Sequence, residues 1–142
     1  MTPASVAWLQ RREREEMKSV KAAAFILIFV LVLTIGNSAV LHHKLSDIKA
    51  LTLKISDDAD LLSEAENRER ISALADIWNE NMPYFSYVCS YAALNRADEA
   101  VTEVIGTHKN QAYADTVTAR EKLLDALRRL LELEHFSFGA VF

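Results

Sequence analysis

The feature that most limits what this chain can fold into is an uninterrupted apolar stretch near its N-terminus. Residues 22–41 read AAAFILIFVLVLTIGNSAVL and contain no charged side chain. An α-helix rises 1.5 Å per residue, so this stretch is about 30 Å long, which matches the hydrocarbon core of a bilayer. Thr34, Gly36, Asn37 and Ser38 in its second half are tolerated in membrane helices. The stretch therefore predicts a single transmembrane helix.

Two other interpretations of this stretch agree less well with its sequence. A cleaved signal peptide has a shorter leader, a shorter apolar core and a small-x-small cleavage site, whereas GNSAV offers only a poor site. A buried helix of a globular domain normally has shorter apolar runs. We therefore expect an uncleaved signal anchor.

The orientation of the span follows from the positions of Lys and Arg, which favour the cytoplasmic side. The basic residues before the span are Arg11, Arg12, Arg14, Lys18 and Lys21. Those after it, Lys44, Lys49 and Lys54, are spread more widely. We predict a single-pass protein of the cell membrane with a cytoplasmic leader (1–21), a span (22–41) and an extracytoplasmic helical domain (42–142). The leader, with Trp8, is expected to lie along the inner membrane surface as a short amphipathic helix.

The composition favours helices after the span. Only three Gly and two Pro are present in 142 residues, too few for a sheet with many tight turns. The net charge is −4 and the acidic residues prevail after the span, which argues against nucleic acid as a partner. Cys89 is the only cysteine, so the chain forms no internal disulfide.

Apolar residues recur at helical spacing beyond the span. The first series is Leu41, Leu45, Ile48, Thr52, Ile55, Ala59 and Leu62. It predicts that the membrane helix continues outward as an amphipathic stalk, loosened in the segment ISDDAD. A turn is expected at residues 66–68, with Asn67 as the N-cap of the next helix.

Three more helices follow from the same spacing. The second series is Ile71, Leu74, Trp78, Met82, Phe85, Cys89 and Ala92, and it crosses Pro83, which predicts a kink near residues 79–82. The third helix has Ala97, Ala100, Val101, Val104 and Ile105 inward and ends at Gly106. The fourth, from about residue 113 to 134, has Val117, Leu123, Leu124, Leu127, Leu130 and Leu131 as its apolar stripe. The predicted fold is all-α: one N-terminal transmembrane helix continuing into a small antiparallel helical bundle.

Two aromatic groups are the candidate interaction residues. Tyr84, Tyr87 and Tyr91 share steps of three and four, which predicts a row beside the Trp78 and Phe85 core positions. Packing in the core is the favoured explanation of this row, and a contact patch is the alternative. The chain ends on EHFSFGAVF, so Phe136, Phe138 and Phe142 follow a helix that is expected to end near His135. This tail either caps its own bundle or docks on a partner.

The sequence predicts no catalytic, cofactor or metal site. His42, His43 and Asp47 could hold a metal by helical spacing, but a third ligand with a known pattern is missing. Cys89 is expected to be a small buried hydrophobe. Phosphate-binding loops and GxSxG motifs are absent from the sequence. An enzyme is therefore the least favoured class.

The segments WNENMPYFSYV and LLELEHFSFGAVF give the chain a resemblance to one bacterial family. It resembles small single-span membrane proteins of Gram-positive, largely spore-forming bacteria, known only as a domain of unknown function. Their closing motif is usually Phe-Ser-x-x-Asn-Ile-Phe; Phe136, Ser137 and Phe142 match it, whereas Ala140 and Val141 depart from it. A His common after the aromatic stretch in that family is absent here. The resemblance implies this architecture and location and an accessory role beside multi-span membrane proteins; it implies no activity.

The leading functional hypothesis is a membrane-anchored helical accessory protein that binds another membrane protein or itself. The alternative is an extracytoplasmic sensor or ligand-binding module, because small helical bundles can hold a ligand between their helices. An enclosed apolar pocket in the structure would favour the alternative.

The predicted orientation gives a direct test. Protease added to intact cells that express the protein should remove residues 42–142, because they are expected outside, and leave the leader protected. An epitope tag at each end, followed by immunoblotting, measures this. Protection of the C-terminal tag in intact cells, with cleavage only after lysis, would show the opposite orientation.

Overall fold

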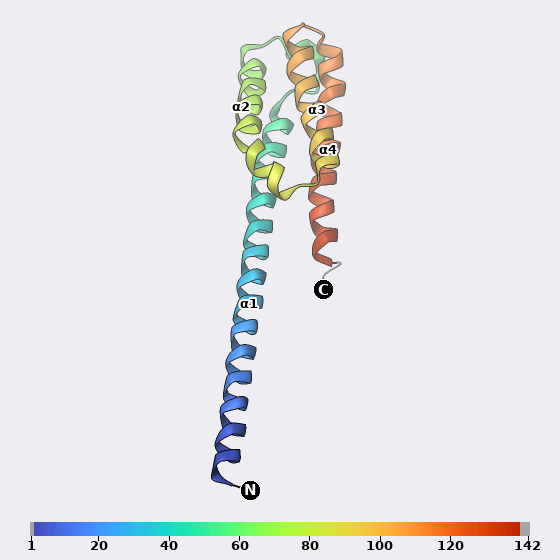
Figure 1. The fold of residues 1–142 in the computed structure, drawn as a ribbon. Helices are drawn as coiled ribbons and strands as arrows, with labels where there is room; N and C mark the ends of the chain where they lie inside the picture. The colour runs from blue at the N-terminus through green and yellow to red at the C-terminus, as the bar shows by residue number, and fades with distance from the viewer. Residues whose placement is uncertain (1, 140–142) are drawn as a thin grey trace. The chain divides into compact units, whose positions relative to one another are not determined.

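The computed structural model describes residues 2–139, and the side chains of residues 2–133. Its elements are α1 (Pro3–Lys54), the short 3-10 helix η1 (Ala59–Leu61), α2 (Ala65–Val88), α3 (Tyr91–Lys109) and α4 (Tyr113–Gly139). No strand occurs in the described residues, so the all-α prediction is confirmed. Figure 1 shows these elements along the chain.

The chain divides into two compact units, Met1–Ala39 and Val40–Phe142. The first unit consists of the N-terminal part of α1, which is long and apolar enough to cross a membrane by length and composition. Helix α1 begins at Pro3, a position where the missing N–H of proline costs nothing. The leader is therefore part of α1 and not the separate surface helix that we expected from the sequence. Arg12 lies over the Trp8 ring at 5.6 Å.

The second unit is a helical bundle that includes the last turns of α1. The first apolar series is buried as predicted, at Leu41, Leu45, Ile48, Thr52, Ile55 and Leu62, with Ala59 half-buried. Helix α2 runs back beside these turns of α1, and α3 and α4 lie side by side (Figure 1). The main buried side chains from α2, α3 and α4 are Ile71, Leu74, Trp78, Phe85, Leu94, Ala97, Val101, Val104, Leu123, Leu127 and Leu130.

The connection between α1 and α2 differs from the prediction. Helix α1 ends at Lys54, and α2 begins at Ala65, earlier than the turn expected at residues 66–68. Asn67 is not an N-cap; it is buried inside α2 and braces the loop. Its side chain accepts from the Ser56 N–H at 3.0 Å and donates to the Leu61 carbonyl at 2.9 Å. The Asn67 side chain thus bonds to backbone groups of the preceding loop and does not cap the N-terminus of α2.

Helix α2 continues through Pro83 and ends at Val88. The members of the second apolar series after Phe85, which are Cys89 and Ala92, therefore lie outside this helix. Cys89 and Ser90 are extended, and the Ser90 side chain caps α3 by accepting from the Ala93 N–H at 3.4 Å. The prediction that Ala92 and Tyr91 belong to the second helix is therefore wrong. An N-cap serine interrupts a spacing that otherwise looks continuous.

The ends of α3 and α4 also differ from the predicted ends. Helix α3 passes Gly106 and ends at Lys109, and Gln111 turns the chain with a φ of 61°, a conformation uncommon for a residue other than glycine. Helix α4 continues to Gly139, beyond the end predicted near His135. Phe142 and the side chains of Phe136 and Phe138 lie outside the described residues, so neither role predicted for the tail is tested.

Two arginines hold the C-terminal end of α1. Arg120 of α4, only 7% exposed, donates through Nε to the Ile55 carbonyl at 2.9 Å and through Nη2 to the Leu53 carbonyl at 3.4 Å. Arg70 of α2 donates to the Lys54 carbonyl at 2.6 Å. The last carbonyls of a helix have no partner within it and carry partial negative charge, so guanidinium groups satisfy both needs. These bonds tie α2 and α4 to the same helix end.

Replacing Arg120 with Met should lower the free energy of unfolding of the bundle by about 2 kcal/mol, because the carbonyl of the buried Ile55 loses its donor. Thermal or urea unfolding of the full chain in detergent, followed by near-UV circular dichroism, measures this. Arg128→Met is the matched control on the same helix, where the side chain is exposed; its effect should stay within about 0.5 kcal/mol. Equal effects of the two substitutions would contradict the account.

Candidate interaction surfaces

The three tyrosines of the predicted row do not share one helix. Tyr84 lies on α2 and is half-buried, with its ring 6.0 Å from Phe85. Tyr87 near the end of α2 and Tyr91 at the start of α3 are 91% and 84% exposed. Packing in the core, the favoured explanation, therefore holds for Tyr84 and is wrong for Tyr87 and Tyr91.

Tyr84 belongs to a small polar cluster that joins α1 to α2. Lys44 of α1 donates from Nζ to Asn81 Oδ1 at 2.6 Å, and its amine lies 5.4 Å from the centre of the Tyr84 ring. Asn81 is buried and donates in turn to the Ile77 carbonyl at 2.8 Å. A lysine amine over an aromatic face is attracted electrostatically by the ring. The cluster fixes which residues of α1 and α2 lie at the same level.

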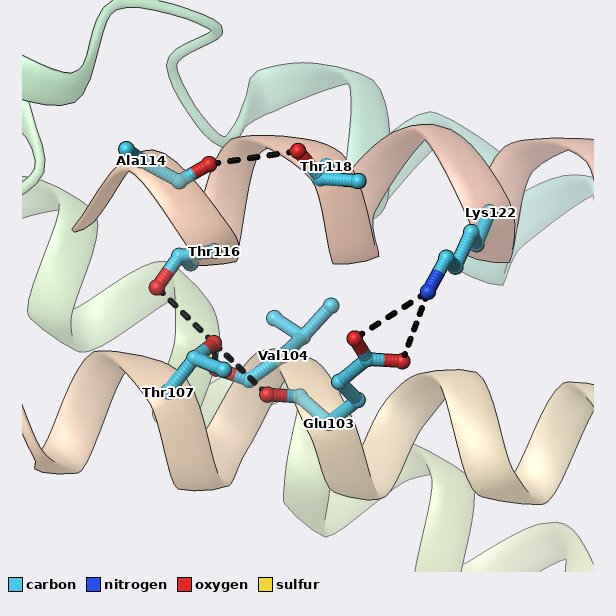
Figure 2. A network of polar contacts seen from close by, with 7 residues as sticks. All are labelled: Glu103, Val104, Thr107, Ala114, Thr116, Thr118 and Lys122. Atoms are coloured by element: carbon cyan, nitrogen blue, oxygen red, sulfur yellow. Dashed lines mark hydrogen bonds and ion pairs between the residues drawn. The ribbon is translucent and has the colours of Figure 1, made fainter. Parts of the chain in front are cut away.

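Polar contacts join the C-terminal half of α3 to the N-terminal half of α4, as Figure 2 shows. The Thr116 hydroxyl donates to the Thr107 hydroxyl at 2.9 Å, and Thr107 passes the bond to the Glu103 carbonyl at 2.6 Å. Lys122 Nζ lies 3.3 Å from Glu103 Oε1 (Figure 2). These contacts fix the antiparallel alignment of the two helices.

A charged groove of about 310 Å³ lies between α3 and α4. Its charged residues are Arg96, Glu99, Glu103, Lys122, Asp125 and Arg129, and Ala100 and Ala126 complete the lining. The two alanines are buried members of the core. Because their side chains are small, they leave the space of the groove, and the charged side chains surround it. The groove is open, and charges of both signs line it. A surface of this kind suits a protein partner of mixed charge better than an apolar ligand.

Asp125 is held ionised by two arginines in this groove. Hydrogen bonding from Arg128, at 2.6 Å, is the main cause that lowers the pKa of Asp125 below its ordinary value, and the positive charges of Arg129 and Arg128 add to it. Arg129 Nε lies 3.1 Å from Asp125 Oδ2. Arg128 thus pairs with Asp125, one turn earlier on α4. The Glu121 partner is Arg120, whereas Lys122 reaches Glu103.

The remaining polar candidates have structural roles. His43 Nε2 lies 3.4 Å from Asp47 on the exposed face of α1, and among the described residues no group of three or more His, Cys, Asp or Glu is placed to hold a metal ion. His108 Nε2 contacts the Leu62 carbonyl at 2.8 Å, which ties α3 to the loop before α2. The Trp78 indole donates to Asp98 at 2.8 Å and joins α2 to α3. Cys89 is half-buried against the core, as a small hydrophobe would be.

Comparison with known proteins adds no relative: no family model, curated protein or solved structure matches this chain. The resemblance to the family of single-span bacterial proteins therefore stays a prediction.

The groove gives a pH-dependent prediction. Because its pKa is lowered, the Asp125 carboxyl should stay ionised at a pH where an ordinary aspartate is protonated, and its contribution to stability should be lost as pH falls through the lowered pKa. A carbon-13 NMR titration of the side-chain carboxyl measures this. Arg128→Gln should raise the pKa toward the ordinary value, and Arg68→Gln, on α2, is the control. An ordinary pKa in the unmodified protein would contradict the assignment.

Proposed function

We propose that the protein is a single-pass membrane protein whose helical bundle is an accessory module that binds another membrane protein or a second copy at the membrane surface. The observation that carries this proposal is that Leu41 belongs both to the predicted span and to the bundle core. It is the last residue of the predicted span, and it is also a fully buried member of the bundle core. Because the predicted span and Leu41 belong to the same helix, the anchor would hold the bundle close to partners in or on the membrane.

The side of the bundle that we propose for the partner is the charged groove. Its residues come from two helices whose alignment is fixed by the Thr116–Thr107 and Lys122–Glu103 contacts. A fixed array of alternating charges favours selective recognition, because a wrongly charged partner meets like charges. Contacts between exposed charges are screened by salt, so binding through the groove should weaken as ionic strength rises.

The bundle interior supports this class over a ligand-binding module. Every buried side-chain nitrogen and oxygen that the structure describes has a hydrogen-bond partner. Asn67 and Arg120 bond to backbone carbonyls of neighbouring segments. The core positions between the helices are occupied by Trp78, Phe85 and aliphatic side chains in mutual contact. These buried polar and apolar side chains therefore hold the helices together.

Purification of the full chain from its own membranes in mild detergent at low salt, with intact-mass measurement, tests the proposal. We expect a stoichiometric complex with a membrane protein or a homo-oligomer. Glu99→Lys should release the partner because it inverts a charge in the groove, whereas Glu69→Lys, an exposed residue of α2 outside the groove, should retain it. A monomer without a partner at every salt concentration would contradict the function. Equal retention by both variants would move the contact away from the groove.

A further inference from the structure

The large apolar side chains that the bundle exposes gather at one end of it. Among the described residues they include Val40, Tyr87, Tyr91 and Leu133, whereas Leu53 and Leu61 lie at the opposite end. Side-chain contacts align α1 with α2 and α3 with α4. This alignment places these exposed residues at a similar height along the bundle.

Helices α1 and α2 are antiparallel, and two contacts set their alignment. Lys44 bonds to Asn81 near one end, and the Lys54 carbonyl bonds to Arg70 near the other. By this alignment, Phe85 on α2 lies at the level of about Val40 on α1. Tyr87 follows Phe85 by two residues, so it lies within one helical turn of the level of Val40, near the end of the predicted span.

The same argument applies to α3 and α4. Thr107 pairs with Thr116, and Glu103 pairs with Lys122. Extended to the first residue of α3, this alignment brings Tyr91 to the level of Leu133. Tyr91 also follows Tyr87 through the tight connection at Cys89 and Ser90, so the exposed residues of both helix pairs share one end of the bundle.

The connections at the two ends of the bundle differ in charge. Between Glu80 and Arg96 the chain carries no charged residue, and this stretch forms the α2–α3 connection. The opposite end holds the loop between α1 and α2, with Asp57, Asp58 and Asp60. Charged side chains are costly near a bilayer's apolar region, so an α2–α3 connection without charged residues is suited to contact with lipid.

We propose that the α2–α3 connection lies in the headgroup layer of the bilayer, with the Tyr87 and Tyr91 rings as interfacial anchors. A tyrosine ring has an apolar body and a polar hydroxyl, and such side chains are enriched at the boundary between lipid and water. Val40, which lies near this connection within the bundle, continues along α1 directly into the predicted span. Lipid is favoured over a protein occupant because residues 81–95 carry no charge and expose two tyrosine rings close to that residue. This inference rests on the proposed membrane anchor.

Fluorine NMR of the full chain in nanodiscs tests the inference with the natural residues in place. The protein is labelled with 3-fluorotyrosine, and its signals are assigned by single Tyr→Phe variants. The lipids are phosphatidylcholine and phosphatidylglycerol, with and without a nitroxide on the choline headgroup. Tyr113 is the internal control, because α3 separates it from Tyr91 by about 27 Å along the helix axis.

We expect the headgroup nitroxide to remove most of the signal of Tyr87 and Tyr91 and to leave the signal of Tyr113. Equal signal loss at all positions, or no loss at Tyr87 and Tyr91, would overturn the inference. If these two signals also resist a water-soluble gadolinium chelate that broadens Tyr113, a protein covers them instead of lipid. These failures leave the anchor intact, whereas a protein that does not co-elute with the nanodiscs would overturn the proposed anchor as well.

Discussion

The bond between the Arg120 guanidinium and the last carbonyls of α1 is the contact on which the rest of the bundle depends. A long helix that ends inside a folded unit leaves carbonyls without partners, and Ile55, which follows the last residue of α1, is buried. Arg120 from α4 and Arg70 from α2 supply the donors, and His108 from α3 holds the loop that follows at Leu62. Each of the three later helices thus has a side chain fixed to the end of α1 or the loop after it.

This arrangement explains how the last turns of α1 become part of the bundle. Leu41, Leu45, Ile48 and Thr52 give α1 a buried face along its last turns, and the arginines close its end. The helix proposed to cross the membrane is then also a structural part of the bundle. A partner that binds the charged groove, on α3 and α4, binds elements that are bonded through Arg120 to the end of that helix.

Much of the fold was predictable because apolar spacing reports burial directly. The series from Leu41 to Leu62 and the stripe through Leu123, Leu127 and Leu130 are buried as expected. The boundaries were not predictable from spacing alone. Ser90 interrupts a series that keeps its period by coincidence. Asn67, a residue typical of N-caps, instead lies in the first turn of α2 and braces the loop before it.

The candidate surfaces were predictable only in part, for a similar reason. Tyr87 and Tyr91 were recognised as residues of interest, but their exposure depends on the chain reversal at Ser90, which places them on different helices. The charged groove was missed because its residues lie far apart in sequence, and only the antiparallel contact of α3 and α4 brings Glu103 to Lys122. The Arg120 contact joins residues that no local pattern relates.

Hydrogen exchange of the full chain in lipid nanodiscs tests the central claim, that the last turns of α1 are part of the bundle core. Amides from about Lys44 to Lys54 should exchange only with the opening that exposes the α4 core around Leu123 and Leu127, because both are released together when the bundle unfolds. Exchange of residues 44–54 at the rate of an isolated exposed helix, while α3 and α4 stay protected, would contradict the account.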